Sequence, residues 1–248
     1  MSSLKTIIFG KLFKVALRFF YCKIRVYSEI TWKKQRIHMI HYEEGSKTLF
    51  IGDSITDCGR DRNNSLGLGG GYVQMLAARL GTAFAELNPV FMNRGISGNR
   101  VKDLRDRWDK DCLSEQPDVL SIYIGINDTW RRFDSNDPTS PEKFEEDYRH
   151  ILEAARRSLG SCQIVMVEPF VLPVPSEKWK WREDLDPKIS VTRKLALEFA
   201  DAYVPLDGVF AAACCRQEPS FWAGDGVHPS NAGHNLIAEA WLSYTGLT

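Results

Sequence analysis

A short apolar run recurs along the chain, and each time it stops in a turn of glycine and small polar residues. This pattern restricts the fold more than any other feature. Short apolar runs bounded by turn-forming residues are typical of buried strands. The first three end in Gly52-Asp53-Ser54, in residues 93–100 and in Gly125-Ile126-Asn127-Asp128. The predicted strands cover residues 48–51, 89–92, 118–124, 162–167 and 203–206, the last with Pro205 inside it, as on a sheet edge.

Segments with helical periodicity separate these strands. The predicted helices cover residues 72–80, 101–113, 141–159, 187–200, 209–215 and 231–244. Strands that alternate with helices predict a parallel sheet covered on both faces. Residues 58–71, rich in glycine, and residues 171–187, rich in proline and tryptophan, are predicted loops. We expect a single domain over residues 39–248, because no internal repeat divides it.

Residues 1–38 differ in composition from the rest of the chain. They hold nine lysines and arginines against the single acid Glu29, although the whole chain has zero formal net charge. Lys11, Lys14 and Arg18 fall on one face of a helix among apolar residues, a pattern that can lie on an anionic membrane surface. The alternative is an extension outside the fold, or translation from an upstream start, with the natural beginning near Met39. Charges interrupt the apolar region, so a secretory signal is not predicted.

The overall composition argues against several classes of protein. Zero net charge gives no support to a nucleic-acid partner. No stretch approaches the roughly 20 apolar residues of a membrane span. The six cysteines show no C-x-x-C spacing, and a chain of 248 residues can bury a sizeable core without disulfides. We therefore expect reduced thiols and a cytoplasmic protein.

Ser54 is a candidate nucleophile because of its place just beyond a strand. In open α/β sheets, ligands bind outside the carboxyl ends of the strands. Gly52 allows the chain to turn sharply there and to present the serine at that edge. The alternative is that Ser54 merely caps a following helix. The serine can act as a nucleophile only if a base reaches its hydroxyl.

The segment Asp225-Gly226-Val227-His228, just before the last predicted helix, supplies such a base. The Asp-x-x-His spacing lets Asp225 reach the Nδ1 side of His228 and leaves the other ring nitrogen free for Ser54. Histidine titrates near neutral pH, so it can take and return a proton. Donors for a developing oxyanion are available in the backbone N–H groups of Ser54 and Gly98 and in the side-chain amide of Asn127.

Each of these signals also has a simpler interpretation. The Asp-x-x-His spacing occurs in loop salt bridges, and Asn127 can belong to an ordinary turn. His234 could join Asp225 and His228 in a metal site, but its helical spacing with apolar neighbours and the lack of further ligands argue against a metal. The glycines of residues 66–71 fit neither phosphate-binding pattern. The joint order of the blocks along the chain is what favours catalysis.

Together these blocks resemble the SGNH, or GDSL-type, hydrolase family. The matching blocks are Gly52-Asp53-Ser54, Gly98-Asn99, Gly125-Ile126-Asn127-Asp128 and Asp225-Gly226-Val227-His228-Pro229, and the resemblance spans residue 47 to the end. It implies a flavodoxin-like three-layer α/β/α sandwich with a central parallel five-stranded sheet. It also implies Ser54 as nucleophile, His228 as base, Asp225 as its orienting acid, and Ser54, Gly98 and Asn127 as the oxyanion hole. No metal or other cofactor is expected.

Longer strings around the first three blocks are similar to SGNH-type acetylxylan and acetyl-xylooligosaccharide esterases. This resemblance implies hydrolysis of acetyl esters of carbohydrates. Asp53, Asn99, Trp130 and Trp222 are the candidate substrate-binding residues, and the tryptophans, with Trp179, Trp181 and Phe221, could stack on sugars or instead pack in the core. The alternative function is a lysophospholipase-like or thioesterase-like hydrolase of lipid acyl chains, attached to membranes through residues 1–38. Relatives of this kind associate, so a homo-oligomer is expected.

Overall fold

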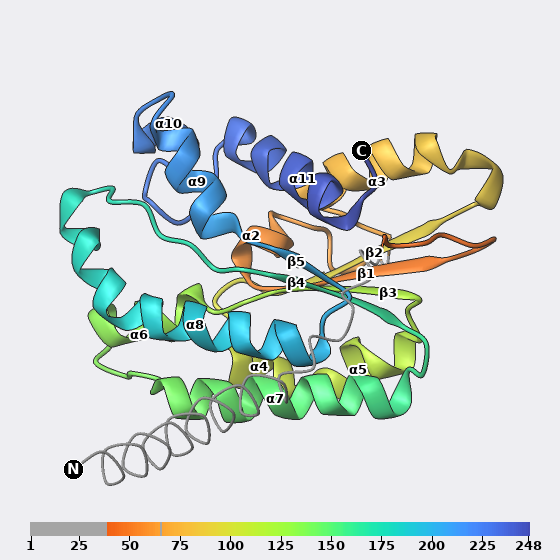
Figure 1. The fold of residues 1–248 in the computed structure, drawn as a ribbon, viewed down its shortest axis with the longest axis horizontal. Coiled ribbons are helices and arrows are strands. Elements are labelled where there is room, and N and C mark those ends of the chain that lie inside the picture. Colours follow the sequence, from red (N-terminus) through yellow and green to blue (C-terminus); the bar gives the residue numbers. More distant parts are fainter. Residues whose placement is uncertain (1–38, 65) are drawn as a thin grey trace, which may run out of the picture. The chain divides into compact units, whose positions relative to one another are not determined.

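The computed structural model describes residues 39–64 and 66–248 (Figure 1). The predicted amphipathic arm, residues 1–38, lies outside the described residues. Five parallel strands form one sheet in the order β2-β1-β3-β4-β5. This is the flavodoxin-like order, with the sequence changing direction beside β1, so the predicted fold class is confirmed. The strands are β1 (Lys47–Gly52), β2 (Val90–Gly95), β3 (Val119–Tyr123), β4 (Gln163–Val167) and β5 (Ala202–Val204).

Helices cover both faces of the sheet, because successive strand residues point to opposite sides. Phe50 packs in one core cluster with residues of α3 and α11, whereas Leu49 and Ile51 pack in a second cluster with residues of α4 and α7. Figure 1 shows the same division, with α3, α9 and α11 above the sheet and α4, α5, α7 and α8 below it. The longer helices are α3 (Tyr72–Ala83), α6 (Ile126–Asp134), α7 (Pro141–Ser158), α8 (Arg182–Phe199), α9 (Leu206–Cys214) and α11 (Asn231–Thr245).

The remaining helices are short. The predicted helix over residues 101–113 is broken, because α4 and α5 are separated at Arg107, whose backbone leaves the helical region. The short helices are α2 (Ser54–Asp57), α4 (Val101–Asp106), α5 (Trp108–Asp111), α10 (Pro219–Trp222), η1 (Ala85–Leu87), η2 (Leu113–Glu115) and η3 (Ser176–Trp181). Pro205 follows β5 instead of lying inside it, although β5 is an edge strand as predicted.

The prediction of a loop over residues 171–187 is wrong in its second half. The 3₁₀ helix η3 leads directly into α8, which begins at Arg182 and contains Pro187 in its second turn. Proline lacks the N–H group that an interior helical position donates, so tertiary contacts must stabilise this turn. Leu185 and Ile189 are buried in the core, and Lys188 pairs with Asp184 within the helix. Burial of the α8 face that carries Leu185 and Ile189 therefore stabilises the helix despite Pro187, which by itself favours a helix boundary.

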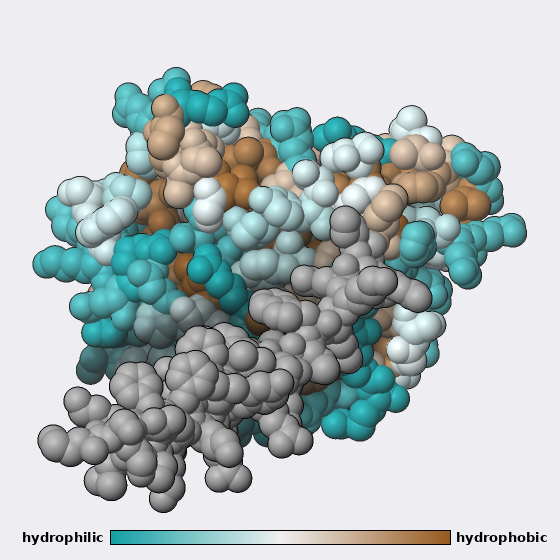
Figure 2. All heavy atoms as spheres, in the orientation of Figure 1, coloured by the Kyte–Doolittle hydropathy of each residue, from teal (hydrophilic) through white to brown (hydrophobic). Residues whose placement is uncertain are grey.

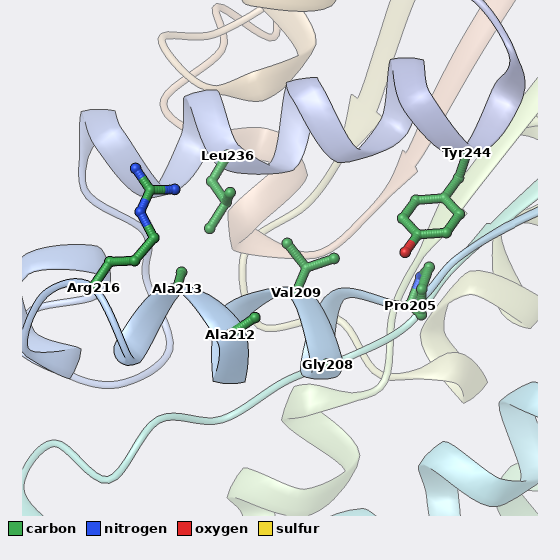
Figure 3. A pocket seen from close by; sticks show the side chains of 8 residues that line it. All are labelled: Pro205, Gly208, Val209, Ala212, Ala213, Arg216, Leu236 and Tyr244. Atoms are coloured by element: carbon green, nitrogen blue, oxygen red, sulfur yellow. The ribbon is translucent and has the colours of Figure 1, made fainter.

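A hollow of about 380 Å³ lies between α9 and α11 (Figure 3). Val209, Ala212 and Leu236 give it apolar walls, and Arg216 and Tyr244 stand at its ends. Figure 2 shows apolar surface over the same two helices. None of the candidate catalytic residues lines this hollow. Within the described residues, no helix combines the length and the apolar composition that crossing a membrane requires.

Candidate active site

Ser54 is the first residue of α2, directly beyond the carboxyl end of β1. The side chain of Asp53 accepts a hydrogen bond from the backbone N–H of Ile55, at 3.0 Å, so Asp53 caps this short helix and the hydroxyl of Ser54 is left for other contacts. Gly52 is required by packing, because a Cβ at this position would lie 2.1 Å from the carbonyl oxygen of Tyr123 in β3. The local backbone thus presents Ser54 at the sheet edge.

The structure brings Ser54, His228 and Asp225 into one hydrogen-bonded chain. Ser54 Oγ lies 2.9 Å from His228 Nε2, and His228 Nδ1 lies 2.7 Å from Asp225 Oδ2. The side chains of His228 and Asp225 are 47% and 43% exposed. This hydrogen-bonded set of side chains therefore lies at the protein surface, where a substrate can reach it. This arrangement has the nucleophile, the base and the orienting acid in the order that an activated serine needs.

The loop that carries His228 is ordered by the carboxylate of Asp225. Asp225 Oδ1 accepts the backbone N–H groups of Val227 at 2.9 Å and of His228 at 2.7 Å. Gly226 has φ +79°, and a Cβ there would lie 2.3 Å from the carbonyl oxygen of Leu172. Leu172 in turn donates its N–H to the carbonyl of Gly226 at 2.8 Å. Glycine is therefore required between Asp225 and His228.

The titration of these groups follows from their contacts. Burial by itself would raise the pKa of Asp225, but hydrogen bonds from the His228 ring and from two backbone N–H groups hold that pKa well below its usual range. The hydrogen bond to Asp225 raises the pKa of His228 above its ordinary value, and partial burial opposes the rise. Burial also raises the pKa of Asp53, to about 7, against the hydrogen bond from Ile55.

The turns that carry the predicted oxyanion donors meet beside Ser54. Ile96 donates its N–H to the carbonyl of Gly52 at 3.1 Å, and the side-chain amide of Asn127 donates to the carbonyl of Asn99 at 3.1 Å. Within the described part of the chain, the backbone N–H groups of Ser54 and Gly98 make no hydrogen bond. Each of these groups, together with the second amide hydrogen of Asn127, is therefore available to a ligand.

Two side chains that sequence reasoning missed hold these turns together. Arg107 donates to the carbonyl of Gly52 at 3.2 Å, to the carbonyl of Arg94 at 2.8 Å and to the side-chain oxygen of Asn99 at 2.8 Å. The buried carboxylate of Asp128 accepts the N–H of Val101 at 3.1 Å and so fixes the start of α6 to the start of α4. No spacing in the sequence indicates these contacts, because each joins separate segments.

The predicted substrate-binding residues have different environments. Trp130, in α6, is half-buried, and its ring centroid lies 5.7 Å from that of His228. Asn99 is half-buried and bonded to Arg107. Asp53 is fully buried. Trp222 is 7% exposed, packs in the core near α11 and donates to the carbonyl of Gln217 at 3.3 Å. Among the four, Trp130 is the one with a side chain that contacts the His228 ring.

A third residue missed by sequence reasoning is Lys178, in η3. Its ammonium lies 4.7 Å from the ring centroid of Trp130 and 4.8 Å from that of Trp181, and it donates to the carbonyl oxygen of Asp225. The sequence signal available was a lysine three residues before Trp181 and next to Trp179, but this segment was predicted to be a loop. The contacts place a cation directly beside the loop of Asp225 and His228.

His234 has structural contacts that account for it without a metal. Its Nδ1 accepts the backbone N–H of Tyr72 at 3.2 Å, and its Nε2 lies 3.4 Å from the sulfur of Cys58. Burial lowers the pKa of His234 to about 4, so the ring is neutral at physiological pH. Among residues 39–64 and 66–248, no group of three or more histidine, cysteine or carboxylate side chains is arranged to hold a metal ion.

The chain is similar to known proteins over most of its length. Residues 50–236 match the GDSL-like lipase/acylhydrolase family. The chain is 37% identical over 211 residues to an acetylxylan esterase from Geobacillus stearothermophilus, covering 82% of this chain and 94% of the relative. The solved structure of a protein from Parabacteroides merdae, described as a GDSL-like lipase, superposes with a TM-score of 0.82 at 42% identity, over 84% of this chain and 99% of that one.

A second solved structure is that of a mutant of Axe2, described as an acetyl-xylooligosaccharide esterase from a Geobacillus species. It superposes with a TM-score of 0.78 at 34% identity, over 84% of this chain and 98% of Axe2. Other structures of Axe2 are described as catalytic mutants, in which a serine, an aspartate or a histidine is replaced. The same three residue types form the hydrogen-bonded chain described above.

Proposed function

This chain belongs to the GDSL-like lipase/acylhydrolase family and is a carboxylic ester hydrolase; we propose that it removes acetyl groups from carbohydrate hydroxyls through an acyl-enzyme on Ser54. The observation that carries the proposal is the chain of hydrogen bonds from Ser54 through His228 to Asp225, at 2.9 and 2.7 Å. The relatives described as acetylxylan and acetyl-xylooligosaccharide esterases support the substrate class.

In the proposed reaction, Ser54 Oγ attacks the ester carbonyl carbon while His228 Nε2 takes the hydroxyl proton. Asp225 holds the ring with its proton on Nδ1 and stabilises the imidazolium that forms. The N–H groups of Ser54 and Gly98 and the amide of Asn127 donate to the oxyanion of the tetrahedral intermediate. His228 then protonates the leaving alcohol, and the acetyl group stays on Ser54. Water, activated by His228, attacks the acyl-enzyme and releases acetate.

The half-buried ring of Trp130 supports a sugar as the leaving group. Aromatic rings bind the apolar faces of sugars by stacking, and Trp130 stands beside the base that protonates the departing hydroxyl. The buried environment of Trp222 gives that ring no comparable role.

The alternative proposal is a lipid acyl hydrolase. The observation that favours it is the basic, apolar sequence of residues 1–38, which would attach the enzyme to an anionic membrane surface. Deleting residues 1–38 tests this alternative, because a lipid hydrolase would lose activity on vesicle-bound substrates while keeping its activity on dissolved esters.

The test of the main proposal compares p-nitrophenyl acetate, butyrate and octanoate as substrates for the wild type and for Ser54→Ala. We expect a steep preference for acetate, loss of turnover in the variant, and release of acetate from acetylated xylo-oligosaccharides. A serine-directed phosphonate should modify Ser54 in the wild type. A preference for octanoate would favour the lipid alternative, and wild-type turnover in Ser54→Ala would contradict the acyl-enzyme.

We further propose a cytoplasmic enzyme. All five cysteines in the described part of the chain are free thiols, which suits a reducing compartment. The division into residues 1–38 and a hydrolase domain over 39–248, and the homo-oligomer, remain proposals. Truncation before Met39 and measurement of the molecular mass in solution test them.

A further inference from the structure

We propose that Lys178 is a positioning residue that fastens the loop of Asp225 and His228 to the tryptophan pair Trp130 and Trp181 and holds a compensating positive charge beside the base. The inference rests on the proposed function, because it assigns His228 the part of general base. It concerns a residue outside the serine–histidine–aspartate chain, in a segment that otherwise carries no chemistry.

The first support is the geometry of the fastening. The ammonium of Lys178 lies between two aromatic rings of different elements, 4.7 Å from the centroid of Trp130 and 4.8 Å from that of Trp181. The two rings themselves contact each other, with centroids 5.3 Å apart. An ammonium over the face of a tryptophan ring is attracted by the negative potential of that face. These two contacts hold the flexible lysine stem in one position.

The second support is the group that this ammonium binds. Lys178 Nζ donates to the backbone carbonyl of Asp225, and the next carbonyl, that of Gly226, accepts the N–H of Leu172 at 2.8 Å. Two consecutive carbonyls of the acid–base loop are thus held by the segment that leaves β4. The carboxylate of Asp225 holds the N–H groups on the other side of the same loop. Because the ammonium binds the backbone, the carboxylate of Asp225 remains paired with the ring of His228.

The third support is the balance of charge around His228. Two acids favour its protonated form: Asp225 on its own loop, through the ring hydrogen bond, and Asp53 before α2. Partial burial of the ring opposes them, and so, to a smaller extent, does Lys178 in η3. A protonated His228 in turn disfavours protonation of His234 in α11. A base that stays protonated at neutral pH cannot accept the proton of Ser54. The cation therefore keeps more of His228 in its neutral, active form.

A purely structural lysine would make the same contacts, so the test must separate charge from packing. Lys178→Met keeps the length of the stem but loses the charge and the donor, Lys178→Gln keeps a donor without charge, and Lys178→Arg keeps both. The matched control is Lys180→Met, because Lys180 is an exposed lysine of the same η3 segment with no side-chain hydrogen bond in the described residues.

Two measurements report the effect of the Lys178 charge on His228. The pH profile of kcat/KM on p-nitrophenyl acetate should have its acidic limb at higher pH in Lys178→Met and Lys178→Gln. On that limb we expect kcat/KM to fall by about three- to tenfold, as removal of one partly screened charge predicts. Lys178→Arg and Lys180→Met should stay within twofold of the wild type. The proton NMR signals of the His228 ring are assigned by their loss in His228→Gln. The midpoint of their titration should move to higher pH, by a shift that corresponds to the same three- to tenfold change.

The outcomes are separable from those of the proposed function. If neither the NMR titration midpoint of His228 nor the acidic limb moves in Lys178→Met and Lys178→Gln, the proposed effect of the Lys178 charge is wrong. Wild-type kcat at every pH in Lys178→Met would overturn the positioning role. A uniform loss of kcat in Lys178→Met that Lys178→Gln restores would support the positioning. If the wild type hydrolyses no ester, the proposed function fails, whereas the NMR titration still decides whether Lys178 acts on His228.

Discussion

Replacing Asp225 with asparagine tests the acid–base chain most directly. The change keeps the shape of the side chain, and its remaining carbonyl oxygen can still accept the N–H groups of Val227 and His228 that order the loop. The side-chain amide, however, points a donor at Nδ1 of the ring. The ring then favours the tautomer with its proton on Nε2, which cannot accept the proton of Ser54.

The magnitude follows from the 2.7 Å contact between Nδ1 and the carboxylate. A hydrogen bond to a charged group contributes about 1.5–3 kcal/mol, and about 1.4 kcal/mol corresponds to a factor of ten in rate. The lost contact therefore accounts for about 10- to 150-fold, and the wrong tautomer adds to it. In buried serine protease triads the same change lowers kcat about 10⁴-fold. Because the side chains of Asp225 and His228 are 43% and 47% exposed, we expect a smaller loss, about 10²- to 10³-fold.

The assay is steady-state hydrolysis of p-nitrophenyl acetate at pH 8, with kcat and KM determined separately. The loss should lie in kcat, because the carboxylate of Asp225 acts on the base and not on the bound ester. Asp225→Ala should lose more and unfold at a lower temperature, since it also frees two N–H groups of the loop. Asp186→Asn, at an exposed carboxylate of α8 paired with Arg182, is the control. If kcat of Asp225→Asn stayed within threefold of the wild type, the assignment of Asp225 would be wrong.

Three further predictions concern the same site. Asn127→Ala should lower kcat about 10²- to 10³-fold with little change in KM, because one oxyanion donor is lost; an unchanged kcat in steady-state assays would remove Asn127 from the hole. The kcat/KM of the wild type should fall as the pH decreases through the raised pKa of His228. The midpoint of the acidic limb of the pH–rate profile should therefore lie above the ordinary histidine pKa of about 6.5. A midpoint below that value would contradict the effect of Asp225. Gly226→Ala should destabilise the fold by at least about 1–3 kcal/mol, because φ is +79° and the new Cβ would lie 2.3 Å from the carbonyl of Leu172. Equilibrium denaturation in urea measures this change in the free energy of unfolding. Wild-type stability would show that the loop can adopt another backbone conformation.

The strands and the blocks that follow them were predictable because their signals are local. A buried strand must be apolar, and a sharp turn at its end requires glycine, as at Gly52, where a Cβ would lie 2.1 Å from the carbonyl of Tyr123. The start of α8 was not predictable in the same way. Pro187 is a strong local signal for a boundary, but the buried faces of Leu185 and Ile189 outweigh it. In so short a segment, the spacing of apolar residues does not indicate such tertiary contacts.

That Ser54, His228 and Asp225 lie together was predictable for the same reason, since the blocks that hold them need particular backbone turns, as at Gly52 and Gly226. The surroundings of the site were not. Trp222 and Trp130 carry equal signals in the sequence, but one ring is buried beside α11 and the other reaches His228. Arg107 and Lys178 act through backbone carbonyls of other segments, which any sequence provides. Their roles depend on which segments the fold brings together.

The two halves of the catalytic chain are held in different ways, and this difference decides where mutations will act. Ser54 stands at the start of a helix whose cap, Asp53, and preceding strand are buried, so its position depends on the core. His228 stands on an exposed loop that contacts from the segment after β4 and its own aspartate keep ordered. Changes at Leu172 or Lys178, which contact this loop, should therefore alter turnover through His228. In the proposed mechanism, Leu172 and Lys178 thus support the base, although they contribute no atom to the reaction.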